Sequence, residues 1–193
     1  VLFRPPMPDF PAVRLDSPRA RTAAYFDNAS SHPLSVHSAA ALHRYVEWLT
    51  HEVGEPWWPQ WAAARDESKR LFARLINARP EEIAFARSTV ESESNLLNGM
   101  GAFLAGGNVV TNDLHYGAAL YNYQMRHQEG LELRVVKNRG WRIELEDMAR
   151  AIDGNTRLVS LSLVSNVNGL LAQVQEISEL AHDRGALLYA DII

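Results

Sequence analysis

Four groups of side chains that could act on a ligand each follow a short apolar run of the chain. A pair of small hydroxyl residues with a valine comes first, then an imidazole, an amide and finally a carboxylate. In chain order these residues are Ser88, Thr89, Val90, His115, Asn166 and Asp191. Ligands of open parallel sheets bind beyond the carboxyl ends of the strands, so we expect the four groups to share one edge of a sheet.

The first group predicts an anion-binding turn between a strand and a helix. Such a turn presents free backbone N–H groups at the positive end of the helix dipole, which suits a phosphate. The spacing of Ser88 and Glu91 also matches a capping box, which is a purely structural use of the same residues. The two interpretations are compatible, because a capped helix still has other amides to offer.

The other three groups also have both a functional and a structural interpretation. His115 could stack on a heteroaromatic ring or titrate near neutral pH, although a single loop histidine is more often a surface residue. Asn166 belongs to Ser-Asn-Val-Asn-Gly, which contains an ordinary turn signal. Asp191 ends an apolar run, where a partly buried carboxylate favours a cationic partner.

Together the four groups match the needs of one ligand. The helix N-terminus suits a phosphate, the imidazole a flat ring, the amide a ring hydroxyl, and the carboxylate a protonated ring nitrogen. These are the parts of pyridoxal phosphate, which withdraws electrons from the α-carbon of an amino acid. We therefore expect a pyridoxal phosphate site in which His115 and Asp191 are the catalytic residues.

The elements that must position these residues alternate along the second half of the chain. Short apolar runs predict strands, and apolar residues at three- and four-residue steps predict helices between them. The predicted strands cover residues 83–86, 109–111, 131–136, 158–164 and 186–190, and the predicted helices cover 91–104, 117–127, 146–152 and 174–185. This order predicts an α/β fold, a mainly parallel sheet with helices on both faces, incomplete at the C-terminus.

The first part of the chain has a different organisation. Residues 1–24 hold five of the nine prolines, and we predict an extended N-terminal arm there. Two helices should follow, over 33–51 and 60–78, and residues 25–193 should form the N-terminal portion of a cofactor-binding large domain. Trp57 and Trp58 could line a substrate pocket, or could pack at a domain or subunit contact.

Composition excludes several classes of function. The chain has 193 residues with a net charge of −4 and no basic cluster, which disfavours nucleic acid and anionic membranes as partners. It has no cysteine and no histidine pair spaced for a metal, so we expect no metal site and a cytoplasmic location. The chain ends two residues after Asp191, beside an apolar strand, and we expect it to be the front portion of a longer protein.

Five segments, in order, resemble the class V aminotransferase family of fold type I pyridoxal phosphate enzymes. That family includes cysteine desulfurases, isopenicillin N epimerase-like proteins and kynureninases. The segments are residues 25–30, 85–92, 113–115, 164–169 and 189–191. Val-Ser-Asn-Val-Asn-Gly at 164–169 and Tyr-Ala-Asp at 189–191 are the most specific of them.

The resemblance implies a role for each candidate residue. It implies that Thr89 and the amide of Val90 contact the phosphate, and that His115 stacks on the pyridine ring. It also implies that Asn166 bonds the ring hydroxyl and that Asp191 pairs with the ring nitrogen. Ser88 belongs to the same turn, and the resemblance implies that it also contacts the cofactor.

The sequence departs from the family pattern at two positions and leaves one residue unassigned. Val90 stands where a second hydroxyl residue is common, and Ser94 stands where an asparagine is expected. In some relatives the residue that stacks on the cofactor ring is shifted by one position, which makes Tyr116 an alternative to His115. The family lysine lies a few tens of residues beyond the aspartate, so we expect neither Lys69 nor Lys137 to serve and the catalytic lysine to lie outside this chain.

The resemblance implies a pyridoxal phosphate-dependent enzyme that acts on an amino acid through an aldimine and a carbanion at Cα. The activity would be most like that of a cysteine desulfurase or another C–S lyase. Alternatives are a class V aminotransferase, an isopenicillin N epimerase-like enzyme, a non-catalytic protein that keeps the cofactor pocket, and an α/β enzyme for another phosphorylated ligand. Family members are usually homodimers, so we expect a homodimer, with contacts from the proline-rich arm and the two tryptophans.

Overall fold

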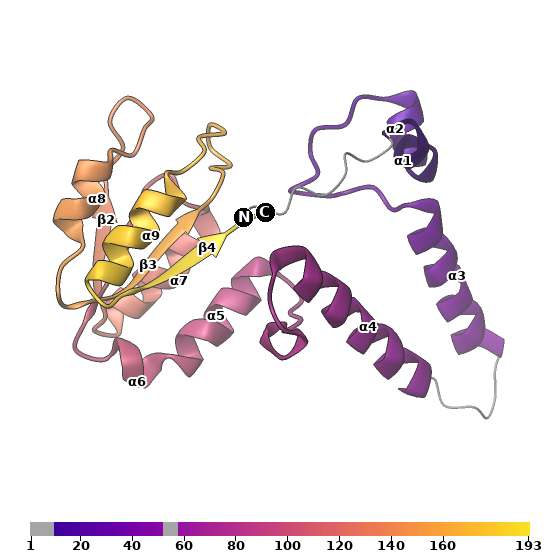
Figure 1. Cartoon of the computed structure of the whole chain (residues 1–193), viewed down its shortest axis with the longest axis horizontal. Helices are drawn as coiled ribbons and strands as arrows, with labels where there is room; N and C mark the ends of the chain where they lie inside the picture. Colours follow the sequence, from indigo (N-terminus) through magenta and orange to yellow (C-terminus); the bar gives the residue numbers. More distant parts are fainter. Residues whose placement is uncertain (1–9, 52–57) are drawn as a thin grey trace. The chain divides into compact units, whose positions relative to one another are not determined.

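The computed structural model describes residues 10–51 and 58–193, and the chain divides into two compact units (Figure 1). The first unit is Val1–Ile83 and the second is Ala84–Ile193. The described part of the first unit contains helices, whereas the second holds a sheet with helices on both faces. Every candidate residue of the cofactor site belongs to the second unit.

The first unit corrects the prediction for the N-terminal arm. Its elements are α1 (Phe10–Asp16), α2 (Pro18–Thr22), α3 (Val36–His51), α4 (Trp58–Ile76) and a 3-10 turn, η1 (Pro80–Glu82). The extended conformation expected for residues 1–24 is wrong at α1 and α2, and residues 1–9 lie outside the described residues. Pro18 is the first residue of α2, a position where the backbone N–H makes no hydrogen bond within the helix, so its absence in proline costs nothing.

The two longer helices predicted for this unit are confirmed, with shifted ends. The predicted helix over 33–51 begins at Val36, and the predicted helix over 60–78 runs from Trp58 to Ile76. Trp57 lies outside the described residues, so the prediction for the tryptophan pair stays a prediction. Trp58 is exposed at the start of α4 and its ring packs edge-on against Trp61, with 6.3 Å between the ring centroids.

The second unit confirms the predicted α/β fold. Its strands form one parallel sheet in the order β2-β1-β3-β4, with helices between them along the chain. The strands are β1 (Asn108–Asn112), β2 (Glu132–Val136), β3 (Thr156–Ser162) and β4 (Leu187–Asp191). The helices are α5 (Thr89–Gly99), α6 (Gly101–Leu104), α7 (Gly117–Gln128), α8 (Leu145–Ala151) and α9 (Val174–Asp183).

The strand predicted at residues 83–86 is wrong. These residues form no regular element, and none of the strands in the described chain pairs with them. A strand requires a neighbour for its backbone hydrogen bonds, and an apolar run alone does not supply one. Phe85 is consequently 60% exposed instead of packing in a sheet.

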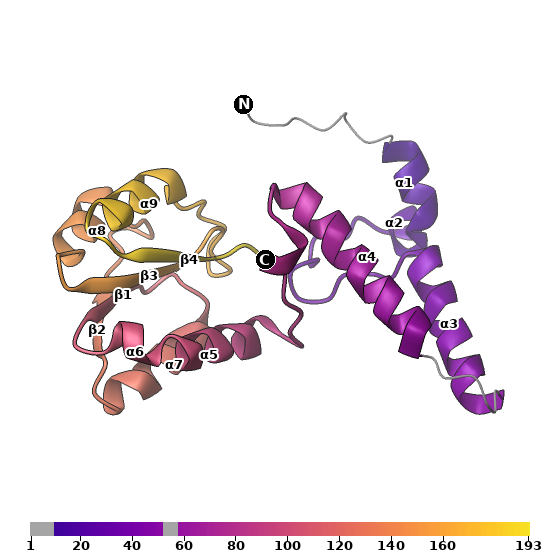
Figure 2. The same cartoon turned by 60° about the horizontal axis from the view of Figure 1, so that its bottom comes forward.

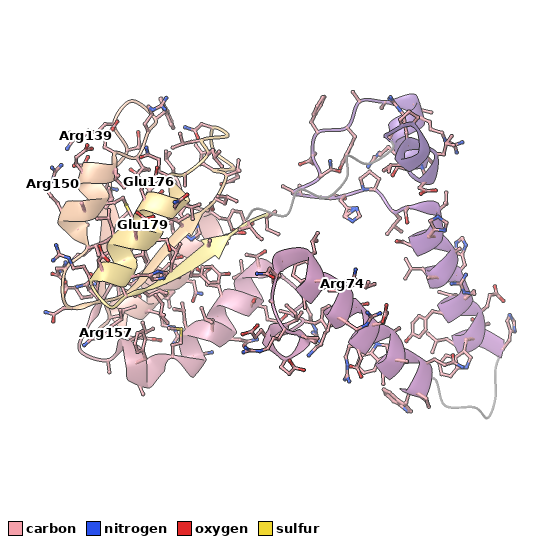
Figure 3. All side chains as sticks on the ribbon, viewed as in Figure 1. Arg74, Arg139, Arg150, Arg157, Glu176 and Glu179 are labelled. Atoms are coloured by element: carbon pink, nitrogen blue, oxygen red, sulfur yellow. The ribbon has the colours of Figure 1, made fainter. Side chains whose placement is uncertain are left out.

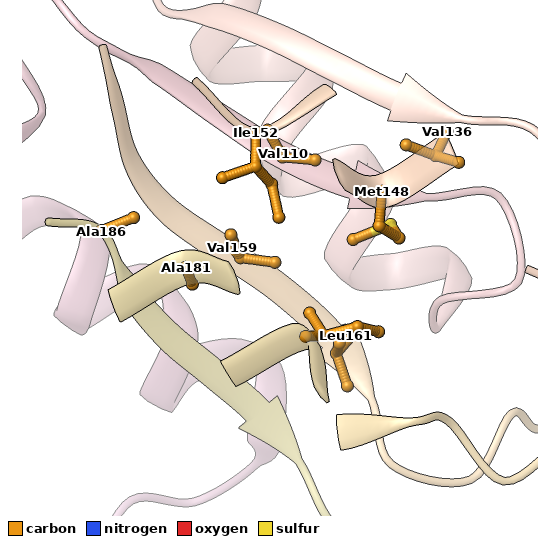
Figure 4. Packing of buried hydrophobic residues seen from close by; sticks show 9 residues of the cluster. Val110, Val136, Met148, Ile152, Val159, Leu161, Ala181 and Ala186 are labelled. Atoms are coloured by element: carbon orange, nitrogen blue, oxygen red, sulfur yellow. The ribbon is translucent and has the colours of Figure 1, made fainter. Parts of the chain in front are cut away.

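Alternate residues of β3 supply two hydrophobic cores on opposite faces of the sheet. Val159 and Leu161 pack with Met148 of α8 in one core, which is seen at close range in Figure 4. Leu158 packs with Tyr123 of α7 in the other core. Figure 2 shows α8 and α9 on one side of the sheet and α5, α6 and α7 on the other. β3 is therefore covered on both faces, as its nearly continuous apolar run predicted.

The same alternation places two buried hydroxyls at the carboxyl end of β3. Successive side chains of a strand point to opposite faces, so Ser160 and Ser162 share the face of Leu158. Tyr189 and Asp191 share that face of β4, because they pair in register with these two serines.

No helix within residues 10–51 and 58–193 is long and apolar enough to cross a membrane.

Candidate functional site

Three of the four predicted groups lie at one edge of the sheet. β1, β3 and β4 are parallel neighbours, so the segments that follow them leave the sheet at the same edge. His115 follows β1, Asn166 follows β3, and Asp191 is the last residue of β4. Leu163, the residue that follows β3, donates its backbone N–H to the carbonyl oxygen of Asp191 at 2.7 Å.

The fourth group forms the N-terminus of α5. Ser88 is the N-cap residue, and its Oγ accepts a hydrogen bond from the N–H of Glu91 at 3.2 Å. The carboxylate of Glu91 accepts from the N–H of Arg87 at 2.8 Å, one residue before the cap. The amides of Thr89 and Val90 make no hydrogen bond with any described residue. The capping function is therefore confirmed, and it leaves two adjacent N–H groups free for an anion.

His115 is buried rather than exposed in its loop, at 1% of its possible accessibility. Its Nδ1 lies 2.8 Å from the Oγ of Ser162, and its Nε2 lies 3.0 Å from the Oγ of Ser160. The ring is enclosed by its neighbours in this chain, and its stacking role stays a prediction. The rival residue Tyr116 is 39% exposed and is the more accessible of the two rings.

An acidic side chain that the sequence analysis did not single out lies beside the imidazole. Glu93 of α5 is fully buried, and its Oε1 is 3.9 Å from Nε2 of His115. The same oxygen accepts hydrogen bonds from the hydroxyls of Tyr123 at 2.7 Å and Ser160 at 3.3 Å. One available signal was the position of Glu93 four residues before Leu97, on the stripe of α5 that faces the core.

The two tyrosines of this cluster remain protonated at neutral pH. Burial raises the pKa of Tyr123 far above its usual value, and the nearby charge of Glu93 adds to this effect. Burial, with smaller contributions from Glu93 and Asp191, raises the pKa of Tyr189 to about 12. Both phenols therefore keep their protons at neutral pH, and Tyr123 donates its proton to Glu93.

Asp191 and Asn166 are available for a ligand. Asp191 is 8% exposed, and one carboxylate oxygen accepts a hydrogen bond from the N–H of Ile193 at 3.3 Å. No lysine, arginine or histidine of the described chain forms an ion pair with it. A carboxylate this buried is stabilised by a cationic partner, which a protonated ring nitrogen would supply. Asn166 is exposed in a turn, and its side chain makes no hydrogen bond within the described residues.

A separate cavity of about 160 Å³ lies at the same edge, toward α9. Its walls include Asn112 and Ser162 from the strand ends, Arg142, and Ile177 of α9. None of the predicted cofactor-binding residues lines this cavity. His115, Asn166 and Asp191 thus share an edge of the sheet, but this cavity is not lined by any of them.

The comparison with known families assigns the chain to a family. The sequence profile described as Aminotransferase class-V matches residues 24–193. The chain belongs to the class-V aminotransferase family. The match extends across both compact units and includes every candidate residue of the site.

The curated relatives of this chain include several proteins named cysteine desulfurase. A probable cysteine desulfurase of Methanothermobacter thermautotrophicus is 30% identical over 183 residues, covering 93% of this chain and 46% of the relative. A cysteine desulfurase of an Enterobacter species is 32% identical over 200 residues, covering 95% of this chain and 47% of the relative. The chain thus spans about half the length of the curated relatives it matches.

Solved structures support the same fold. The apo cysteine desulfurase of Thermococcus onnurineus superposes with a TM-score of 0.76 at 25% identity, covering 97% of this chain and 47% of that one. A variant of the protein titled C-DES, with glycine covalently linked to its pyridoxal phosphate cofactor, gives a TM-score of 0.77 at 16% identity. That match covers 93% of this chain and 49% of the other, and at this identity it shows the fold alone.

Proposed function

We propose that this chain provides the cofactor-binding edge of a pyridoxal phosphate-dependent enzyme that acts on an amino acid, with cysteine desulfuration as its reaction. The observation that carries the proposal is the buried carboxylate of Asp191, which has no cationic partner among the described residues and ends a strand of a parallel sheet. The free amides at the start of α5 and the names of the relatives support it.

The residues present fit the parts of pyridoxal phosphate. The amides of Thr89 and Val90 would hold the phosphate, because two unpaired N–H groups meet the positive end of the α5 dipole there. Asn166 would bond the ring hydroxyl, and Asp191 would accept a hydrogen bond from the ring nitrogen. When bound, the cofactor supplies an electron-withdrawing ring that stabilises negative charge at the α-carbon of the substrate.

The contribution of the chain itself is to hold charge and protons in place. Asp191 would keep a proton on the ring nitrogen of the bound cofactor, because a nearby carboxylate favours the cationic form of its partner. His115 and Tyr116 are adjacent aromatic side chains in the segment that follows β1, and we assign the contact with the cofactor ring to one of them. His115 would hold or move a proton at Nε2, its nitrogen nearer to Glu93.

We also propose that the protein acts as a homodimer in the cytoplasm. Apolar side chains of α3 are exposed, including Leu42, Val46 and Leu49, which lie at three- and four-residue steps on one helix. A face of this kind is suited to contact with another protein surface. Light scattering on the complete protein tests the dimer, and a monomeric mass at micromolar concentration would contradict it.

The test of the activity uses the complete protein, as encoded by its gene, with pyridoxal phosphate and L-cysteine. With an added thiol reductant, we expect a change in the visible absorbance of the cofactor and the release of sulfide with alanine, because the reductant supplies the two electrons that convert the sulfur removed from cysteine to sulfide. Keto-acid formation with an amino acceptor would instead identify an aminotransferase, and inversion at Cα would identify an epimerase-like enzyme. Cofactor binding without turnover of any amino acid would identify a non-catalytic protein.

An unrelated phosphate-binding function has its own outcome. A protein that uses the α5 N-terminus for another ligand would show neither spectral change nor thermal stabilisation with pyridoxal phosphate, while a nucleotide would raise its melting temperature. That result would reject the proposal for the cofactor and for the amino-acid substrate together.

A further inference from the structure

We propose that Glu93 is a positioning residue for His115, which it orients through the hydroxyl of Ser160. The catalytic consequence rests on the function proposed above, whereas the hydrogen-bond arrangement belongs to the protein without cofactor. The three residues come from α5, the loop after β1, and β3, and they meet in the buried layer between the sheet and α7.

The donors around Glu93 determine the direction of each hydrogen bond. Tyr123 donates its hydroxyl to Oε1 of Glu93 at 2.7 Å, and Ser160 donates to the same oxygen at 3.3 Å. Because the single proton of the Ser160 hydroxyl points to the carboxylate, its oxygen is left to accept from the imidazole. Nε2 of His115, 3.0 Å from that oxygen, must then carry a proton.

The other side of the ring agrees with this assignment. Nδ1 of His115 lies 2.8 Å from the Oγ of Ser162, which itself accepts the backbone N–H of Tyr116 at 3.2 Å. The hydroxyl proton of Ser162 is therefore free to be donated to an unprotonated Nδ1. Both ring nitrogens are satisfied in one tautomer, with Nε2 protonated and Nδ1 accepting, so the imidazole has a single orientation.

The burial of the Glu93 carboxylate lowers the stability of the fold unless its oxygens are satisfied by hydrogen bonds. Its second oxygen, Oε2, is buried and has no hydrogen-bond partner among the described residues. An unsatisfied buried oxygen destabilises the fold, and an apolar side chain of similar size would avoid that cost. The chain instead keeps a carboxylate 3.9 Å from the imidazole, where it accepts the hydroxyl proton of Ser160 and so orients the group that contacts Nε2.

Other polar groups around the ring do not replace Glu93. The buried titratable side chains of α5, α7 and β4 are Glu93, Tyr123 and Asp191, and Tyr189 of β4 is partly buried. The tyrosines stay protonated, and Asp191 makes no hydrogen bond to the imidazole or to either serine. Glu93 is therefore the carboxylate that is connected to Nε2 by a hydrogen-bonded hydroxyl.

The first test measures the tautomer of His115 in the cofactor-free complete protein by ¹⁵N NMR of histidine-labelled samples, with the signal assigned by its loss in His115→Asn. We expect wild type and Glu93→Gln to show a protonated Nε2 and an unprotonated Nδ1, because the glutamine oxygen can still accept from Ser160. Glu93→Leu should give a mixture of tautomers. The matched control is Glu179→Leu on the outer side of α9, labelled in Figure 3, which should match wild type.

The second test measures turnover of L-cysteine by the same variants loaded with pyridoxal phosphate. We expect Glu93→Leu to lower kcat by about 10- to 100-fold with KM changed by less than about twofold, and Glu93→Gln to restore most of the rate. Ser160→Ala, a smaller change, should reproduce both effects if Glu93→Leu does not fold.

The two tests separate failure of this inference from failure of the proposed function. A protonated Nδ1 in wild type would overturn the positioning role. So would a tautomer ratio and a kcat that are the same in Glu93→Leu and Ser160→Ala as in wild type. A tautomer that depends on Glu93 in a protein that binds no pyridoxal phosphate would support the positioning role of Glu93 and reject the proposed function alone.

Discussion

The hydroxyl of Tyr123 is a sensitive point of the buried polar cluster. Tyr123→Phe removes the donor that lies 2.7 Å from Oε1 of Glu93 and leaves the aromatic ring in place. The carboxylate would retain one donor, Ser160, at the longer distance of 3.3 Å, and its Oε2 already has no partner within the described structure. A hydrogen bond to a charged group contributes about 1.5–3 kcal/mol, and we expect a loss of stability in that range.

Urea denaturation of the complete protein at neutral pH measures this loss. Tyr121→Phe is the matched control, because Tyr121 lies on the same helix, is 71% exposed and should change stability by less than about 0.5 kcal/mol. The comparison of the two variants cancels the effect of replacing a tyrosine. If Tyr123→Phe were as stable as Tyr121→Phe, Glu93 would not depend on this donor, and the description of the cluster would be wrong.

Three further predictions concern other parts of the second unit. A Cβ at Gly107 would lie 2.6 Å from a backbone carbonyl oxygen, so Gly107→Ala should destabilise by about 1–3 kcal/mol in urea melts, whereas Gly101→Ala, with open space, should not. Arg134 donates a hydrogen bond to Asp153 and holds the pKa of that carboxyl well below its usual range. The resulting stabilisation is complete above about pH 4 and is lost as the pH falls toward the pKa of the folded state. Urea melts should therefore show that the difference in unfolding free energy between wild type and Asp153→Asn becomes smaller in acid. Burial raises the pKa of Tyr189 to about 12, so the folded state holds this proton more tightly than the unfolded state does. The resulting stabilisation is complete below about pH 10 and is lost as the pH rises through 12. Tyr189→Phe should remove one tyrosinate transition from an alkaline absorbance titration.

The sheet was largely predictable because its elements are marked by local sequence. β3 is a run of apolar residues with serines, and α9 shows apolar residues at helical spacing before Gly185, which has a φ of +76°. These patterns require no knowledge of distant residues. The four strands from residue 108 onward were therefore found to within a few residues of their ends.

The errors arose where distant contacts or the position of a residue within an element decide the structure. Residues 83–86 have the composition of a strand but no partner within the described chain, and a strand cannot form alone. Pro18 counted against a helix, although it is favoured at the first position of one. The proline content of a segment therefore predicts a helix boundary better than it predicts an extended chain.

The common edge of three candidate residues was predicted from the sequence, whereas their contacts were not, and their roles at a site stay a prediction. The order of the strands brings His115, Asn166 and Asp191 to one edge, as expected for parallel strands. The enclosure of His115 by two serines and Glu93 was not predicted, because an acid on a helix is usually solvated. Only the packing of α5 against the sheet shows that Glu93 is buried.

The central claim is that Asp191 binds the ring nitrogen of pyridoxal phosphate at the carboxyl edge of this sheet. Titration of the cofactor into the complete protein, followed by visible absorbance, tests it in wild type, in Asp191→Asn and in the control Asp183→Asn at the exposed end of α9. We predict that Asp191→Asn weakens binding by at least about tenfold, whereas the control binds like wild type. Equal dissociation constants and spectra for wild type and Asp191→Asn would contradict the account.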